Sequence, residues 1–597
     1  MSCYEKIVDS ILPEVEKPGR YTGGEYNTPD MTKACKVRVC MCFPDKYEVG
    51  MSNLGIRILY HMLNSDKDIV AERCFAVEED FADKLKKNKI PLLSLETKKP
   101  LKDFDILGIS VQFELLYTNI LYMLDLAEIP FKAADRDQTY PIIIGGGPCS
   151  VNPEPFADFL DIIVIGDGED AMTALVNLYK EHKSKDYDKT EFLKAASEIE
   201  GVYVPAFAEV ENTGRFVTVV KNKFVRQTFV KDFENAYFPT AIQVANIEAV
   251  HDRPVLELFR GCPNGCRFCQ AGFFYRPLRA RSADKIVKQA EESIDKTGFD
   301  EISLASLSTG DYTHIENVVE SLYNLCESKG VNLSLPSLRM DTFTGDITVK
   351  SRLCSLTFAP EAGTQRLRDI INKNITDEDI YSTIREAFKA GYSSVKLYFM
   401  IGLPEETNED LDGIREMVLK IKSIYGLESK GRALNINISA AVFVPKPLTP
   451  FQWEKHIDYD LIVKRQEYLR KALKMKGVRL SWHDYESARL ETVLARGDRR
   501  LADVLITAYR KGAKFESWTE HFNYKIWTEA FREHNIDINT YLDGISLDER
   551  LPWDFIDFYV SKDYLIKERN EAAKGVSTKS CKKGCQGCSD NIFRCGV

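Results

Sequence analysis

The sequence predicts an α/β protein made of two successive strand–helix alternations and a mainly helical C-terminal region. Short apolar runs such as Val37–Phe43 are followed by segments whose apolar residues recur at helical spacing. A second alternation begins at Pro254. Alternating strands and helices are typical of parallel sheets covered by helices.

Five buried strands are expected in the first half of the chain, and they are followed by glycine-rich turns or helices. In a doubly wound sheet the ligand lies at the carboxyl ends of the strands. That edge would contain Gly145, Gly146, Gly147 and Pro148, together with the turn 166–169. We therefore predict a Rossmann-like doubly wound domain over residues 35–198, after an N-terminal segment 1–34. The strands are expected at 37–43, 69–77, 104–110, 141–144 and 161–165.

The second alternation contains six strand–helix units, which predicts a partial (βα)6 barrel over residues 248–485. Ser282 is a candidate N-cap, and Thr376 with Asp379 forms a candidate capping box. Barrel sites lie at the C-terminal ends of the strands. The strands are expected at 254–259, 301–305, 331–335, 355–358, 394–400 and 434–444.

Three further segments complete the predicted organisation. Residues 199–247 read as a β-rich connector, and residues 486–575 as a helical region with a long helix at 488–509. Residues 576–597 form a Cys-rich tail.

Composition limits the classes of function. The net charge of −10 argues against an overall electrostatic surface for nucleic acid. No apolar run is long enough to span a bilayer and no signal peptide is recognisable, so a cytoplasmic protein without a membrane partner is expected. Seven of the fifteen cysteines fall in two short clusters, which indicates metal binding in a reducing compartment.

The first cluster consists of Cys262, Cys266 and Cys269 at C-x3-C-x2-C spacing. Thiolates are ligands that iron–sulfur clusters and zinc select. A structural zinc site normally closes with four protein ligands, whereas this local set stops at three. Three thiolates on a four-iron cluster leave one iron open for a substrate or cofactor, and Phe268 would offer an aromatic face to a bound base. A zinc knuckle or three buried cysteines are the alternatives.

This motif, at the end of a strand, resembles the signature of radical S-adenosylmethionine (SAM) enzymes. The resemblance implies a [4Fe-4S] cluster on Cys262, Cys266 and Cys269, with SAM chelated by the fourth iron. It implies reductive cleavage of SAM to a 5′-deoxyadenosyl radical, with an electron donor such as flavodoxin or ferredoxin.

The same resemblance implies further contacts to SAM at the barrel rim. The turn after the second strand would face the amino group, and the segment around Glu361 resembles the one that reaches the ribose. The stretch containing Gly402 would pack on the adenine. Ordinary barrel-rim structure is the alternative for each residue. The candidate cofactor contacts are Ser308, Gly310, Asp311, Arg339, Glu361 and Gly402.

The first half resembles the cobalamin-binding domain that precedes the barrel in one class of radical SAM proteins. The matching pieces are residues 44–50, 145–148 and 165–169. The D-x-H-x-x-G motif that supplies a histidine to cobalt is absent, and neither His61 nor His182 has that context. The resemblance implies cobalamin without a protein histidine ligand. A degenerate domain that holds no corrin is the alternative.

The tail repeats the C-x3-C-x2-C spacing at Cys581, Cys585 and Cys588, with Cys595 seven residues further on. Four thiolates suffice for zinc or for an auxiliary iron–sulfur cluster. Exposed redox thiols are the alternative.

The sequence thus predicts a radical SAM enzyme, with methyl transfer to an unactivated carbon if cobalamin is bound. A corrin-free methylthiotransferase-like RNA modification enzyme and a non-catalytic iron–sulfur redox sensor are the rival interpretations. The substrate, a small molecule or an RNA, is not encoded in any motif.

Overall fold

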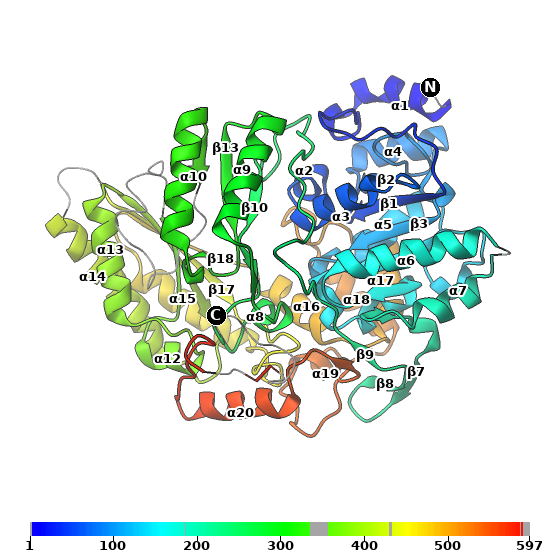
Figure 1. Ribbon diagram of the computed structural model, residues 1–597. Coiled ribbons are helices and arrows are strands. Elements are labelled where there is room, and N and C mark those ends of the chain that lie inside the picture. The colour runs from blue at the N-terminus through cyan, green and yellow to red at the C-terminus, as the bar shows by residue number, and fades with distance from the viewer. Residues whose placement is uncertain (1–2, 186, 335–355, 429–432, 585–586, 589–597) are drawn as a thin grey trace.

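The computed structural model describes residues 3–185, 187–334, 356–428, 433–584 and 587–588. Figure 1 shows the N-terminal sheet and its helices beside a second group of strands that carries its own helices. The two groups correspond to the two alternations expected from the sequence.

The N-terminal sheet has the strand order β2-β1-β3-β4-β5-β6. The first five strands are parallel, and β6 runs antiparallel to β5. This order confirms the doubly wound sheet, with a switch point between β1 and β3. The prediction was incomplete at β6, which lies in the expected connector but joins the sheet. The strands are β1 (Val37–Phe43), β2 (Ile69–Phe75), β3 (Ile106–Ser110), β4 (Ile142–Gly146), β5 (Ile162–Val164) and β6 (Val202–Tyr203).

Helices from distant parts of the chain cover the two faces of this sheet. One face packs against α3 (Leu54–Ser65), α6 (Gly168–Lys183) and α7 (Lys189–Ala196). The other face packs against α5 (Tyr117–Leu126) and against helices of the C-terminal region. The C-terminal helices therefore complete the core of the N-terminal half. They are α16 (Tyr485–Arg496), α17 (Leu501–Arg510) and α18 (Tyr524–Glu533).

The prediction of one long helix at 488–509 is wrong, because the structure has two helices, α16 and α17, in this region. The interruption contains Asp498, which is fully buried. Its carboxylate accepts the N–H of Val217 at 3.0 Å and pairs with Arg500 at 2.6 Å. Asp498 binds the backbone of a connector strand, and the regular helix is interrupted at this position. The apolar periodicity of the sequence cannot predict such a long-range contact.

The barrel strands form two parallel sheets. One contains β10 (Val255–Glu257), β13 (Glu301–Ala305) and β14 (Asn332–Ser334). The other contains β15 (Leu356–Glu361), β16 (Ser394–Ile401), β17 (Asn435–Val442) and β18 (Val478–Trp482). The six expected strands are confirmed, and β18 is one that the sequence left unassigned.

Helices pack on the outer faces of both barrel sheets (Figure 1). The expected caps are present, since Ser282 accepts the N–H of Lys285 and Thr376 and Asp379 form a capping box. The helices are α9 (Ala283–Thr297), α10 (Ile315–Lys329), α13 (Asp377–Lys389), α14 (Asn408–Glu428) and α15 (Tyr459–Ala472).

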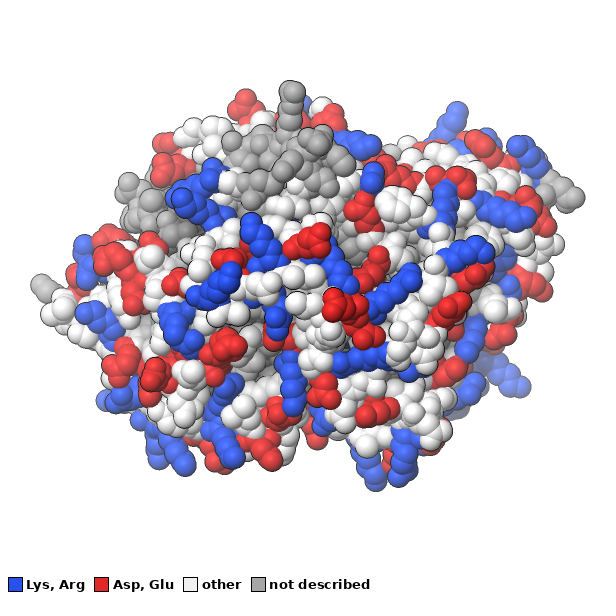
Figure 2. Space-filling view, turned by 90° about the horizontal axis from the view of Figure 1, so that it is seen from below, with Lys and Arg blue, Asp and Glu red and all other residues white. Residues whose placement is uncertain are grey.

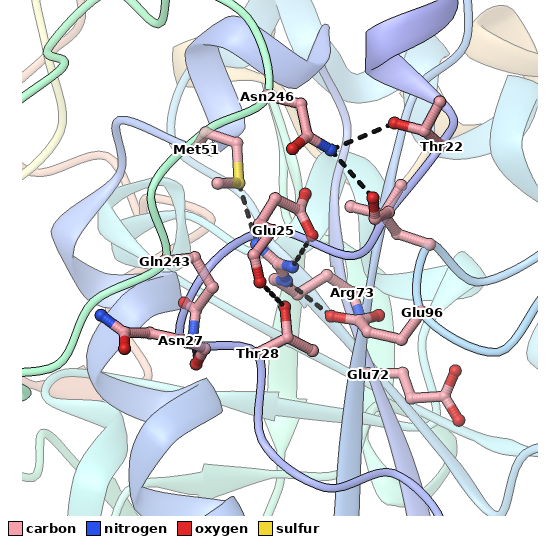
Figure 3. Close-up of polar contacts among 12 residues, drawn as sticks. Thr22, Glu25, Asn27, Thr28, Met51, Glu72, Arg73, Glu96, Gln243 and Asn246 are labelled. Carbon is pink, nitrogen blue, oxygen red and sulfur yellow. Dashed lines mark hydrogen bonds and ion pairs between the residues drawn. The ribbon is translucent and has the colours of Figure 1, made fainter. Parts of the chain in front are cut away.

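A buried ion-pair network ties the N-terminal segment to the edge of the N-terminal sheet. Arg73 on β2 pairs with Glu25 at 2.9 Å and with Glu96 at 2.7 Å. Figure 3 shows both carboxylates converging on this guanidinium, with Asn246 of the connector reaching Thr22 nearby. The segment before β1 is therefore fixed by charge pairing, although its sequence has no strong pattern.

Replacing Arg73 with Met is expected to destabilise the protein strongly. The substitution leaves Glu25 and Glu96 buried without their cation, which costs about 3–5 kcal/mol. Urea unfolding measures the loss. Lys36→Met, which breaks the exposed Lys36–Asp68 pair, is the control and should leave the unfolding free energy nearly unchanged. Equal effects of the two substitutions would contradict this account.

Candidate functional site

The three cysteines lie in a loop between β11 (Phe259–Arg260) and α8 (Gln270–Phe274). Gly261 begins the loop with φ of +88°, and a Cβ there would lie 2.9 Å from the Leu278 Cα. Glycine is required because both the backbone angle and the close approach exclude a side chain.

Buried donors hold the cluster loop from outside. Arg267, fully buried, donates to the carbonyl oxygen of Ile370 at 2.9 Å and pairs with Glu568 at 3.1 Å. Asn372 donates to the carbonyl oxygen of Gly265 at 2.9 Å. The loop is therefore held by the segment after β15 and by the C-terminal helix α20 (Lys562–Ala573).

The three thiols of the loop are the kind of donor that an iron–sulfur cluster selects. Burial, reinforced by the neighbouring thiols, raises the pKa of Cys262 to about 11 and that of Cys269 to about 12. Metal binding would displace these protons. Among the described residues no three His, Cys, Asp or Glu side chains are grouped to share one metal ion. Thiolates that bind separate irons of a cluster stand farther apart than the ligands of a single ion.

The turn after β13 reaches the cluster loop through Asp311. Its carboxylate accepts hydrogen bonds from Asn264 at 2.7 Å and from Ser308 at 2.5 Å. The Asn264 amide also lies 3.7 Å from the Cys262 sulfur. Gly310 belongs to the same turn, Thr309–Asp311. The structure thus brings three of the predicted SAM contacts beside the cysteines.

Glu361 at the end of β15 has a left-handed backbone, with φ of +67°. Non-glycine residues in this region are strained, and such strain is concentrated at functional sites. Its carboxylate pairs with Lys373 at 3.1 Å, and the Lys373 ammonium lies 6.0 Å from the centre of the Phe268 ring. Glu361, Lys373 and Phe268 therefore form one wall beside Cys269.

Gly402 follows β16 and has φ of +85°. The Glu406 carboxylate accepts the N–H groups of Gly402 at 2.8 Å and Leu403 at 3.2 Å, and Arg465 approaches it at 3.0 Å. Burial outweighs these favourable contacts and raises the pKa of Glu406 to about 7. Glu406 therefore fixes the turn that contains Gly402.

A cavity of about 410 Å³ lies between the cluster loop and the carboxyl ends of the N-terminal strands. The glycine-rich turns line it from one side, and Arg260, Gly261 and residues 305–307 at the end of β13 from the other. The three cysteines are not among the described residues that line it. No histidine is among the described residues that line it. His61 instead contacts Gln243 at 3.2 Å. The lining includes Gly145, Gly146, Gly147, Pro148, Asp167, Glu169, Gly261, Tyr275 and Ser306.

Arg260 joins the two walls of this cavity. It immediately precedes Gly261, and its guanidinium pairs with Glu169 at 2.6 Å and Asp167 at 3.3 Å. Arg279, its cross-strand neighbour, contacts Asp167 at 2.5 Å. The two arginines hold the pKa of Asp167 below its usual value despite burial. These ion pairs therefore hold the cluster loop in a fixed position against the N-terminal sheet.

The Cys-rich tail docks on the same loop. The N–H of Cys581 donates to the carbonyl oxygen of Pro263 at 2.8 Å, and Lys582 donates to that of Asp311 at 2.7 Å. The sulfur of Cys588 lies 3.8 Å from Arg276. Of the predicted site residues, Cys585, Cys595 and Arg339 lie outside the described residues.

Sequence reasoning gave no role to Arg260, Asn264 or Lys373. Arg260 and Asn264 adjoin the cysteine motif, so proximity in sequence was a usable signal. Lys373 is separated from that motif by about a hundred residues of chain and carried no pattern that would have found it.

Comparison with known proteins identifies the family. Residues 55–205 match the model for the N-terminal part of radical SAM proteins, and residues 256–418 match the radical SAM superfamily model. The uncharacterized protein MJ0966 of Methanocaldococcus jannaschii is 30% identical over 503 residues, which cover 82% of this chain and 97% of that protein. The chain belongs to the radical SAM superfamily.

Two further similarities are more distant. The anaerobic magnesium-protoporphyrin IX monomethyl ester cyclase of Cereibacter sphaeroides is 24% identical over 43% of this chain and 40% of its own length. The radical SAM methyltransferase TsrM of Kitasatospora setae, solved with cobalamin and a [4Fe-4S] cluster, gives a TM-score of 0.46 at 14% identity. That match covers 68% of this chain and 74% of TsrM.

Membership of this superfamily implies an enzyme that uses a [4Fe-4S] cluster and SAM. The three thiols, Glu361 and the Asp311 turn lie near the C-terminal ends of the barrel strands. Within the described parts of the chain, no helix is both long enough and apolar enough to cross a membrane.

The raised pKa of Glu406 predicts a specific pH dependence. The folded protein binds this proton more tightly than the unfolded chain, so the wild type loses stability relative to Glu406→Gln as the pH rises from about 5 to 8. The change should be up to about 3 kcal/mol. Urea unfolding at both pH values measures it, with Glu405→Gln at the exposed neighbouring position as control. A difference between wild type and Glu406→Gln that is independent of pH would refute this assignment.

Proposed function

We propose that this chain is a cobalamin-dependent radical SAM methyltransferase acting on an unactivated carbon. The single observation that carries the proposal is the cavity that Arg260 and Gly261, the two residues before Cys262, share with the glycine-rich ends of the N-terminal strands. A corrin seated on Gly145–Pro148 would face the cluster across this space.

The residues of the loop would hold the cluster and position SAM. The thiolates of Cys262, Cys266 and Cys269 would bind three irons, and the reduced cluster would supply the electron that cleaves SAM to methionine and a 5′-deoxyadenosyl radical. Asp311, held by Asn264 and Ser308, offers a carboxylate to an amino group. Glu361, held by Lys373, offers one to hydroxyl groups.

The N-terminal sheet would bind the corrin, which would carry the methyl group. Gly146 lines the cavity, and a Cβ added there would make only ordinary van der Waals contact with Val164 at 3.6 Å. The absence of histidine from the described lining supports a corrin that takes no histidine ligand from this wall. With both cofactors bound, the walls would exclude bulk water and position the reacting groups, which is the protein's share in cofactor chemistry.

The tail is proposed to hold a second metal through its cysteines, as zinc or as an auxiliary iron–sulfur cluster. The docking of Cys581 on Pro263 supports a site close to the SAM cluster. Flavodoxin or ferredoxin is the proposed electron donor.

The first test concerns SAM cleavage. Reconstituted wild-type protein with dithionite should convert SAM to 5′-deoxyadenosine, and Cys269→Ala should reduce the rate at least a hundredfold because one iron loses its ligand. Liquid chromatography of the nucleoside measures this. Cys326→Ala, on the buried face of α10, is the control and should keep the activity. Failure of the reconstituted wild type to form the nucleoside would exclude a radical SAM enzyme.

The second test concerns the corrin. Gly146→Leu places a side chain in the cavity without backbone strain and should abolish hydroxocobalamin uptake while leaving the iron content and SAM cleavage intact. Absorbance after gel filtration measures uptake. Gly426→Leu on the exposed face of α14 has open space around it and is the control. A wild type that never retains cobalamin would favour the corrin-free RNA modification enzyme.

A further inference from the structure

The inner face of the β15–β18 sheet carries a row of polar and cationic side chains. Lys396 on β16 is in register with Asn437 on β17, and Asn437 is in register with Arg479 on β18. The flanking residues Leu397 and Ile438 point to the opposite face, where they pack in the core under α13, α14 and α15. Alternation along a strand therefore turns the row away from these helices, which Figure 1 shows on the outside of the barrel.

The two cations of this row have no anionic partner in the described chain. No carboxylate among the described residues lies within ion-pairing distance of Lys396 or Arg479. Lys396 is half-buried and lies 4.9 Å from the centre of the Tyr398 ring on the same face. Barrel interiors are usually filled by branched apolar side chains. An inner face that carries two cations without a carboxylate partner is therefore suited to bind an anionic ligand.

The next row toward the cluster end is uncharged and hydroxylated. Tyr398 is in register with Ser439, and Ser439 with Ser481. Tyr398 is 36% exposed although it lies in the middle of a strand with neighbours on both sides. This exposure shows that the inner face is not filled by packing, and it provides hydrogen-bonding groups between the cations and the cofactor end.

The distance between the cationic row and the cofactor end of the barrel sets the length of a molecule that could reach both. Ile401, the last residue of β16, lies five residues further along the strand than Lys396. At a strand rise of 3.3 Å per residue this is about 16 Å. A molecule with one end at the cationic row would place its far end beside Gly402 and the cluster loop.

We propose that Lys396 and Arg479 bind the anionic end of an elongated small-molecule substrate, a carboxylate or a phosphate. The substrate extends along the inner face of the barrel past Tyr398, Ser439 and Ser481, and presents its reacting carbon at the cluster end. This inference rests on the proposed function, because it assigns the substrate of the same radical site. A guanidinium and an ammonium in one row offer the paired donors that such anions bind.

Calorimetric titration of the reconstituted protein tests the proposal with two probes, inorganic phosphate and glutarate. Lys396→Gln and Arg479→Gln should each weaken binding of the preferred anion at least tenfold. Lys420→Gln on the exposed face of α14 removes the same charge and should have no effect. Lys396→Arg and Arg479→Lys keep the charge and should restore most of the affinity, which separates charge recognition from misfolding.

Each outcome decides a point. Weakened phosphate binding assigns a phosphate end, and weakened glutarate binding assigns a carboxylate end. If neither probe binds the wild type, or if both glutamine variants bind as Lys420→Gln does, the proposal is overturned. Formation of 5′-deoxyadenosine without substrate is measured in the same samples. If 5′-deoxyadenosine forms but no anion binds, only this inference is contradicted. If 5′-deoxyadenosine does not form, the proposed function is contradicted.

Discussion

The ion pairs of Arg260 with Asp167 and Glu169 fix the geometry on which the site depends. Arg260 precedes the cysteine loop directly, and the two carboxylates lie at the start of α6, where Asp167 is the N-cap and Glu169 is in the first turn. Buried pairs contribute little net stability, since desolvation offsets the Coulombic gain, but removal of one partner is costly. Their effect here is positional, because they allow one placement of the loop against the sheet.

The cluster loop is also held by segments far from it in the chain. The backbone after β15 holds it through Asn372, helix α20 through Glu568, and the tail through Cys581. The C-terminal region further covers one face of the N-terminal sheet. A protein arranged in this way positions its reactive loop only when both ends of the chain are folded.

Much of this architecture follows from patterns that the sequence displays. The five N-terminal strands are buried runs, and the capping box at Thr376 is a local signal, so both were predicted correctly. The break between α16 and α17 was missed because the carboxylate of Asp498 serves a distant strand. β18 was missed because its alternating polar residues face the barrel interior and dilute the apolar pattern.

The cysteine loop was likewise recognisable because its ligands are adjacent in sequence. Neither Lys373 nor the Lys396–Asn437–Arg479 row could be recognised in this way, because their neighbours at the site come from separate strands or turns. Pattern reading finds groups that are neighbours along the chain, and the sheet register is needed for the others. The fold was therefore more predictable than the inner surface of the barrel.

The proposed function requires a corrin in the cavity that ends at Gly261, close to a SAM cluster on the cysteines that follow. Electron paramagnetic resonance of the protein loaded with cob(II)alamin and a reduced cluster tests it most directly. We expect magnetic coupling between the two centres, seen as broadening of the cobalt signal that disappears in Cys269→Ala. A protein that retains both groups but gives two independent, unbroadened signals would contradict the account.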